Sequence, residues 1–162
     1  MLKLFVDGSC KNNGREDSVG AWAYVVLDEA EEKLFEDSGA QCLTTNNRME
    51  MTAILEGITG ILDYLSELGI NEPTEIEVYT DSAYVHNCIT QKWYDNWQRN
   101  GWINSSKQPV KNNDLWELLI PYFENPNFTF YKVKGHTGNK DWNDYVDKLA
   151  QSTAMQLKEV AE

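Results

Sequence analysis

Short apolar runs separated by turn residues dominate the N-terminal part of the chain. Residues Leu2–Asp7 alternate toward a buried strand, and two further runs of strand length cover Gly20–Leu27 and Leu34–Cys42. Such runs are typical of β-strands. The segments Asp7-Gly8-Ser9 and Lys11–Gly14 are predicted to be turns. Because the connections are short, we expect the three strands to pair as an antiparallel meander.

The spacing of apolar residues changes to three and four after Cys42. This spacing is seen in a stripe formed by Met51, Ile54, Leu55, Ile58, Ile61, Leu62, Leu65 and Leu68. It predicts a long helix that begins near Thr44–Asn46, whose side chains suit an N-cap, and ends at Gly69. Farther along, we expect strands at 75–80 and 128–133 and helices at about 82–90, 114–123 and 141–158.

The order of these elements indicates an α/β fold. Three strands come first, and helices then alternate with two more strands. A strand–helix–strand step gives parallel strands with a right-handed crossover. We therefore predict a five-stranded mixed sheet, with three antiparallel strands followed by two parallel strands, flanked by helices.

The composition fits one globular domain spanning residues 1–162. Hydrophobic residues make up 41% of the chain and charged residues 25%, which is ordinary for a globular protein. No apolar run approaches the ~20 residues of a membrane span, and we expect no signal peptide and no membrane partner. The cysteines Cys10, Cys42 and Cys88 share no metal-ligand spacing, so we expect a reduced, cytoplasmic chain.

The net charge of −12 argues against a nucleic-acid partner, because phosphate binding usually needs a basic surface. The distribution of charge weakens that objection. Residues 92–140 carry seven Lys/Arg and four Asp/Glu, whereas the segments on either side are acidic. A local basic region can still bind phosphates.

Four carboxylates lie far apart in sequence at places that this fold could bring together. Asp7 and Asp81 are each predicted to end a strand, and ligands gather outside the carboxyl ends of parallel strands. Glu50 lies in the first turns of the long helix, and Asp147 in the first half of the last one. Crowded carboxylates repel each other unless cations neutralise them, and these ligands select Mg²⁺ or Mn²⁺. Two such ions ~4 Å apart can activate a water and stabilise the leaving oxygen of a phosphodiester.

Each of these acids also has an ordinary interpretation when it is taken alone. Asp7 before a glycine could be a turn residue, and Asp81 before Ser82 could cap a helix. Glu50 and Asp147 could be solvated surface charges. The residues around the four acids are needed to decide between the two interpretations.

Five motifs, in order, resemble those of the type 1 ribonuclease H family. They are Asp-Gly-Ser at 7–9, Thr-Asn-Asn-Arg-Met-Glu at 45–50, Thr-Asp-Ser at 80–82, Val-Lys-Gly-His at 133–136 and Asp-Lys-Leu-Ala at 147–150. The resemblance covers nearly the whole chain and implies a ribonuclease H-like fold. It implies a metal-dependent endoribonuclease that hydrolyses the RNA strand of an RNA–DNA hybrid and leaves 5′-phosphate and 3′-hydroxyl ends.

The same resemblance implies the roles of the site residues. Asp7, Glu50, Asp81 and Asp147 would be catalytic residues that bind two Mg²⁺ ions, for which Mn²⁺ could substitute. His136, between Gly135 and Gly138, would be a catalytic residue that moves protons or helps to release product near neutral pH. The alternative for His136 is a plain surface histidine.

Residues 91–111 resemble the basic handle of bacterial members of that family. Three tryptophans are interleaved there with cations, in a set formed by Lys92, Trp93, Trp97, Arg99, Trp102, Lys107 and Lys111. The helical spacing of Trp93 and Trp97 predicts that packing explains most of these rings, while the cations suit DNA phosphates. Because Asp95 and several amides dilute the charge, we expect weak and salt-sensitive hybrid binding.

The resemblance also supplies candidates for substrate contacts. Cys10 and Asn13 match positions that contact RNA riboses, whose 2′-hydroxyls separate RNA from DNA, although Asn13 alone would be read as a turn residue. Asn47 and Thr45 match positions that contact nucleic acid near the active site and in a DNA phosphate pocket. Ala83 replaces a glutamine that commonly touches RNA. The complete set of candidates is Cys10, Asn13, Thr45, Asn47, Trp93, Trp97 and Lys107.

Two other classes of function remain open at this point. One is a non-catalytic module that binds hybrids, which the complete set of carboxylates argues against. The other is a different nuclease with the same fold, such as a junction resolvase or an integrase-like enzyme, since fold alone does not fix function. The Lys134-Gly135-His136 motif and the tryptophan-rich handle argue against it. We expect a monomer that binds an RNA–DNA hybrid.

Overall fold

The computed structural model describes residues 1–133 and 141–161, with the side chains of 158–161 left out. Its strands are β1 (Leu2–Lys11), β2 (Val19–Leu27), β3 (Lys33–Cys42), β4 (Ile76–Thr80) and β5 (Phe128–Lys132). Its helices are α1 (Asn46–Glu67), α2 (Ala83–Gln91), α3 (Trp93–Arg99), α4 (Asn113–Phe123) and α5 (Trp142–Ala161). No helix in the described part is both long and apolar enough to cross a membrane.

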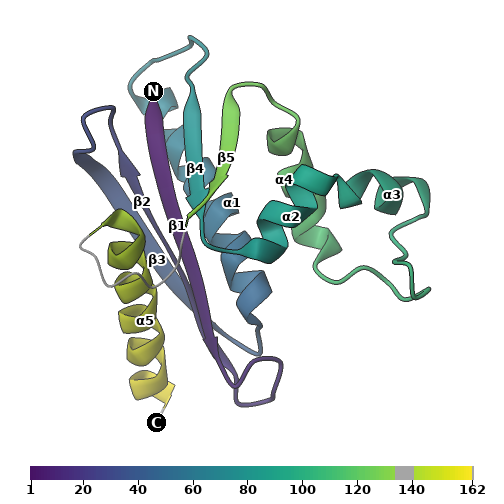
Figure 1. Ribbon diagram of the computed structural model, residues 1–162. Helices are drawn as coiled ribbons and strands as arrows, with labels where there is room; N and C mark the ends of the chain where they lie inside the picture. Colours follow the sequence, from purple (N-terminus) through teal and green to yellow (C-terminus); the bar gives the residue numbers. More distant parts are fainter. Residues whose placement is uncertain (134–140, 162) are drawn as a thin grey trace.

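The strands form one sheet in the order β3-β2-β1-β4-β5 (Figure 1). β1 pairs with β2, and β2 with β3, in antiparallel orientation. β4 pairs in parallel with both β1 and β5. The predicted mixed sheet, with three antiparallel strands followed by two parallel strands, is confirmed.

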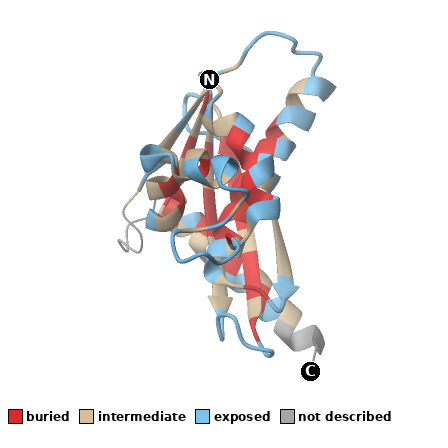
Figure 2. Cartoon of the chain, turned by 90° about the vertical axis from the view of Figure 1, so that its right-hand side faces the viewer, coloured by how far each residue is buried: buried red, intermediate tan, exposed pale blue. Residues whose placement is uncertain are grey.

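The main hydrophobic core lies between one face of the sheet and α1. Leu4 and Val6 of β1 pack there against the apolar stripe of α1, which includes Ile54, Ile58 and Ile61. The core continues into the helices that follow β4, through buried residues such as Trp116 of α4. Figure 2 shows the buried residues concentrated in the sheet and in the helix surfaces against it.

Helix α5 covers the other face of the sheet, over β1, β2 and β3. The contact is made largely by small residues, because Ala150 and Ala154 pack against Ala21 and Ala23. Val146 adds a second apolar contact with β2. Small side chains let the helix lie close to the sheet, so groups on its flanks come near the strands on either side.

Several bounds differ from the predicted ones by one residue, and three differences are larger. β1 runs to Lys11 because its pairing with β2 continues to the Lys11–Val19 pair, so the prediction of a turn at Asp7-Gly8-Ser9 was wrong. α3 was not predicted as a separate helix. Lys92, with a left-handed φ of 52°, ends α2 and starts α3 in a new direction. α5 also extends beyond the predicted end at 158.

Candidate active site

The site begins where β1 and β4 separate. The last parallel pair between these strands joins Phe5 and Tyr79. Asp7 lies two residues beyond that pair on β1, and Asp81 follows the end of β4 directly. The prediction that Asp7 ends its strand was therefore wrong, because β1 continues to Lys11. Asp7 does lie beyond the end of the parallel pairing, where a crevice opens. The helix cap proposed for Asp81 is made by Ser82, whose hydroxyl accepts from the Val85 N–H at 3.2 Å.

Glu50 reaches the crevice because α1 crosses β1 at a glycine. Thr45 is the N-cap of α1, which places Glu50 in the second turn. A Cβ on Gly8 would overlap the backbone of Met49 and Glu50, so only glycine permits this approach. The Gly8 N–H also donates a hydrogen bond to the Glu50 carboxylate. Gly8 is thus needed for close packing rather than for a turn.

Three carboxylates meet at this point. One oxygen each from Asp7, Glu50 and Asp81 lies within 4.8 Å of the other two. Asp7 is 2% exposed and Glu50 is 8% exposed. Among the described residues, no group hydrogen-bonds to the buried Glu50 Oε2. An acidic group with such an unsatisfied buried oxygen fits a hard cation such as Mg²⁺.

Asp147 approaches from α5, on the opposite face of the sheet. It lines the same cleft and hydrogen-bonds to Asp7. It does not belong to the tight group formed by the other three acids. Gln151, one turn later on α5, donates to Asp147 Oδ2 at 3.1 Å. The structure therefore brings all four predicted acids to one cleft, with Asp147 at its α5 side.

Burial and mutual repulsion change the acidity of this group. The pKa of Asp7 is raised to about 11, first by burial and then by the neighbouring charge of Glu50. The pKa of Glu50 is also raised well above its usual value, mainly by burial and then by the charge of Asp81. Without a cation, the site therefore holds protons that a bound cation would displace.

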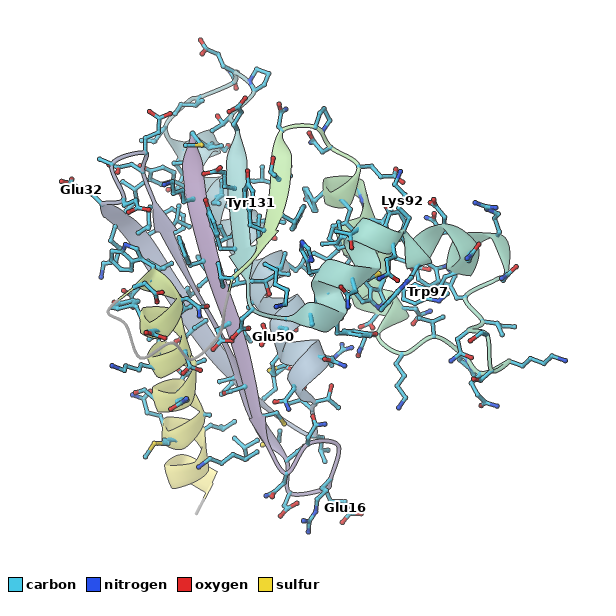
Figure 3. All side chains as sticks on the ribbon, viewed as in Figure 1. Glu16, Glu32, Glu50, Lys92, Trp97 and Tyr131 are labelled. Atoms are coloured by element: carbon cyan, nitrogen blue, oxygen red, sulfur yellow. The ribbon has the colours of Figure 1, made fainter. Side chains whose placement is uncertain are left out.

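The acids lie at the bottom of an open cleft of about 510 Å³. Figure 3 shows Glu50 where α1 meets the central strand. Two candidate substrate residues, Cys10 and Asn47, line the cleft, as does Ala83. The thiol of Cys10 donates to the Thr44 carbonyl at 3.4 Å.

Two other candidates lie beside the cleft and connect its parts. The Asn13 side-chain oxygen accepts from the Asn46 N–H at 2.6 Å, which joins the β1–β2 connection to the start of α1. The Thr45 hydroxyl accepts from the Arg48 N–H at 3.2 Å as the cap of α1. Arg48 in turn makes two hydrogen bonds to Asp114 at 2.7 and 3.1 Å, which join α1 to α4.

The handle residues lie to one side of the sheet, beyond β5 (Figures 1 and 3). Trp97 contacts the rings of Trp93, Trp102 and Trp116, so the prediction that packing explains most of these rings is confirmed. Trp93 and Trp97 also line a hollow of about 380 Å³. Lys107 is exposed, with a left-handed φ of 61°, in a loop ordered by the side chain of Asn104.

His136 lies outside the described residues. Sequence reasoning missed Gln151 and Tyr84, which also line the cleft. The spacing of four between Asp147 and Gln151 was a usable signal, since helix neighbours at that spacing share a face. No motif in the sequence pointed to Tyr84. Its place in the cleft depends on packing of its ring against Trp93 and Trp116, which lie farther along the sequence.

Comparisons with known proteins agree with this geometry. A profile of the RNase H family matches residues 1–155. A ribonuclease H of Clostridium botulinum is 41% identical over 147 residues, which are 91% of each protein.

Among solved structures, LC9-RNase H1, described as a type 1 RNase H with the type 2 active-site motif, has a TM-score of 0.76 at 25% identity. The match covers 96% of this chain and 72% of that one. LC11-RNase H1, solved in complex with an RNA/DNA hybrid, has a TM-score of 0.71 at 18% identity. That match covers 97% of this chain and 99% of the LC11-RNase H1 chain.

Proposed function

The chain belongs to the ribonuclease H family, and from that premise we propose that it is an endoribonuclease that cuts the RNA strand of RNA–DNA hybrids. The proposed products carry 5′-phosphate and 3′-hydroxyl ends. The observation that carries the proposal is the group of three carboxylates at the bottom of an open cleft, with Glu50 Oε2 buried and without a hydrogen-bond partner among the described residues.

The four acids are the proposed metal ligands. Asp7, Glu50, Asp81 and Asp147 would hold two Mg²⁺ ions, for which Mn²⁺ could substitute, and the bound ions would activate a water and stabilise the leaving oxygen. The chain's own contribution is to preorganise these carboxylates. Gly8 holds Glu50 against β1, and Gln151 orients the Asp147 carboxylate.

The residues around the cleft support recognition of the RNA strand. Cys10, Asn13 and Asn47 lie on or beside its wall, and we assign to them the contacts with riboses whose 2′-hydroxyls mark RNA. An open cleft suits a duplex, which must lie across the acids rather than enter a closed pocket. Thr45, at the start of α1, is the proposed contact for a phosphate of the DNA strand.

The handle is the proposed second contact with the DNA strand. Lys107 and its neighbouring cations would bind phosphates, and the exposed edges of Trp93 and Trp97 would pack against sugars. His136 is the proposed residue that moves protons or assists product release, a role that histidine side chains suit near neutral pH. The family membership supports these assignments.

The cellular setting completes the proposal. Cys10, Cys42 and Cys88 are free thiols, which favours a reducing, cytoplasmic location. We propose that residues 1–162 act as one domain and as a monomer. Light scattering at the concentration of the activity assay tests the oligomeric state, and a dimer mass would contradict this part.

A panel of substrates tests the proposed activity. The protein is incubated with Mg²⁺ and a uniform RNA–DNA hybrid, duplex DNA, duplex RNA or the single strands, each labelled at one 5′ end. We expect cleavage of the hybrid's RNA strand alone, and products that a 3′-hydroxyl-dependent polymerase can extend. Cleavage of duplex DNA, or of no substrate at all, would contradict the proposal.

A further inference from the structure

Helix α5 is connected to β3 by polar contacts on the side that faces away from the cleft. Near its start, the Tyr145 hydroxyl donates to Glu36 Oε1. Lys33 Nζ lies 2.7 Å from the same Glu36 oxygen and 3.5 Å from the Tyr145 hydroxyl. Two turns later, the Thr153 hydroxyl donates to the Leu149 carbonyl of its own helix and accepts from the Ser38 hydroxyl of β3, each at 2.8 Å.

These contacts involve one continuous row on each element. Glu36 and Ser38 alternate with Phe35 and Asp37 along β3, so both point to the face that α5 covers. Tyr145 and Thr153 are eight residues apart, which puts them on one side of a helix with 3.6 residues per turn. Leu149, midway between them, packs toward the alanine contact that includes Ala40 of β3.

The groups of α5 that face the cleft lie on the other flank of the same helix. Asp147 and Gln151, at a spacing of four, both line the cleft. Tyr145 and Asp147 are two residues apart, which separates them by about 200° around the helix axis. A rotation of α5 that moved Tyr145 away from β3 would therefore also move Asp147 relative to Asp7.

The packing beneath α5 differs along the helix. Near its start, Trp142 and Val146 pack in an apolar cluster with residues of β1 and β2. Farther along, Ala150 and Ala154 lie against Ala21 and Ala23, and such small side chains let the helix come close to the sheet. The hydrogen bonds to β3 add directional contacts on one flank, opposite the flank on which Asp147 hydrogen-bonds to Asp7.

We propose that Tyr145–Glu36–Lys33 and Thr153–Ser38 form a rotational lock that sets the position of Asp147 against Asp7. The lock residues are positioning residues and do not touch the substrate. The inference rests on the proposed function, because it assigns a purpose to the placement of Asp147. Lys33–Glu36 is a surface ion pair, which adds little stability, whereas small misplacements of a catalytic group lower rates strongly.

Two variants test the lock, each with a matched control, and a third serves as a rescue. Tyr145→Phe removes the hydroxyl and keeps the ring contact with Trp142. Its control is Tyr79→Phe, which removes a tyrosine–glutamate hydrogen bond that stays within β4. Thr153→Val removes the bond to Ser38, and its control is Thr59→Val, which loses the same type of bond to the residue four positions back. Thr153→Ser keeps the hydroxyl and serves as the rescue variant.

The readouts are kcat and KM on the hybrid, the Mg²⁺ concentration at half-maximal rate, and Mn²⁺ binding by calorimetry. For Tyr145→Phe and Thr153→Val we expect kcat about three- to tenfold lower, a higher Mg²⁺ requirement, weaker Mn²⁺ binding and an unchanged KM. The two controls and Thr153→Ser should match the parent. Lower melting temperatures with parent-like kcat and Mn²⁺ binding would overturn the lock.

Asp147→Asn separates a failure of the lock from a failure of the proposed function. If this variant is inactive while the lock variants behave like the parent, the lock is wrong and the site assignment stands. If Asp147→Asn cleaves at the parent rate, both the role of Asp147 and the lock are overturned. If the parent cleaves no hybrid, the proposed function fails, and Mn²⁺ calorimetry on the same variants decides the lock alone.

Discussion

Asp7 combines burial with close contact to other acids, and this combination shapes its protonation. Its pKa of about 11 in the folded protein compares with an ordinary value of 3.8. Because the folded state holds the proton more tightly, the resulting stability is fully present below pH ~4 and is lost progressively as the pH rises toward 11. The metal-free protein should therefore become less stable across the neutral and alkaline range.

Replacing Asp7 with Asn tests this effect on stability. Asn cannot ionise, so Asp7→Asn should melt no lower than the parent in EDTA, and its advantage should grow between pH 5.5 and pH 8.5. Thermal melts of both proteins at the two pH values provide the measurement. A clearly lower melting temperature for Asp7→Asn at pH 8.5 would mean that Asp7 has a structural role instead.

Gly8 supports the site through the absence of a side chain. In Gly8→Ala, the new Cβ would overlap the backbone of Met49 and Glu50, so α1 must shift. We expect a loss of about 1–3 kcal/mol in unfolding free energy together with loss of cleavage, because Glu50 moves with the helix.

Gly69→Ala is the matched control for Gly8→Ala. Gly69 has a φ of +71° and nothing within 4 Å of the added atom, so alanine there costs about 1 kcal/mol of backbone strain without moving the site. Denaturant unfolding and hybrid cleavage of both variants provide the comparison. Full activity in Gly8→Ala would show that the close approach is not needed for function.

At the scale of elements, the handle connects a packed aromatic base to an exposed basic loop. Trp97 is held among three other rings, whereas Lys107 is exposed in the loop between α3 and α4. The first part packs the handle against the helices, and the second presents an exposed cation to which we assign phosphate binding. Substitutions in the two parts should therefore have different consequences.

A salt titration of hybrid affinity tests the basic loop. Each phosphate contact contributes about one to the slope of log affinity against log salt. Lys107→Ala should therefore weaken binding equally for all hybrid sequences and lower the slope by about 1. Lys3→Ala is the control, because Lys3 lies on β1 away from the handle. Its ammonium group is paired at 3.1 Å with Glu31 of the β2–β3 connection. An affinity of the parent that does not change between low and moderate salt would contradict the phosphate contacts.

The elements also show how far the sequence alone could lead. The apolar spacing of three and four predicted helix α1, because a helix buried on one face carries a periodic pattern. The mixed sheet was predicted from the order of the elements and the short connections between the first three strands. Local turn chemistry misled at Gly8, since a glycine needed for close packing looks the same in sequence as a glycine in a turn. The break at Lys92 was equally hidden, because a left-handed lysine has no sequence signature.

For the whole molecule, the distribution of charge matters more than the net charge of −12. Residues 1–91 carry five Lys/Arg and seventeen Asp/Glu, so the cations are concentrated later in the chain, around the handle. This separation of charge fits the proposal that the DNA strand of a hybrid contacts the handle while the RNA strand lies over the acids. The sequence predicted that the four acids meet, and the structure brings them to one cleft. The placement of Asp147 there depends on α5 crossing the far face of the sheet.

The central claim is that these carboxylates form a catalytic metal site, and cleavage by Asp7→Asn tests it most directly. Parent and variant are compared on a uniform RNA–DNA hybrid in Mg²⁺, after circular dichroism has shown the same fold. We predict that the parent cleaves the RNA strand and that the variant loses cleavage while it stays folded. Turnover of the folded variant at the parent rate would contradict the account.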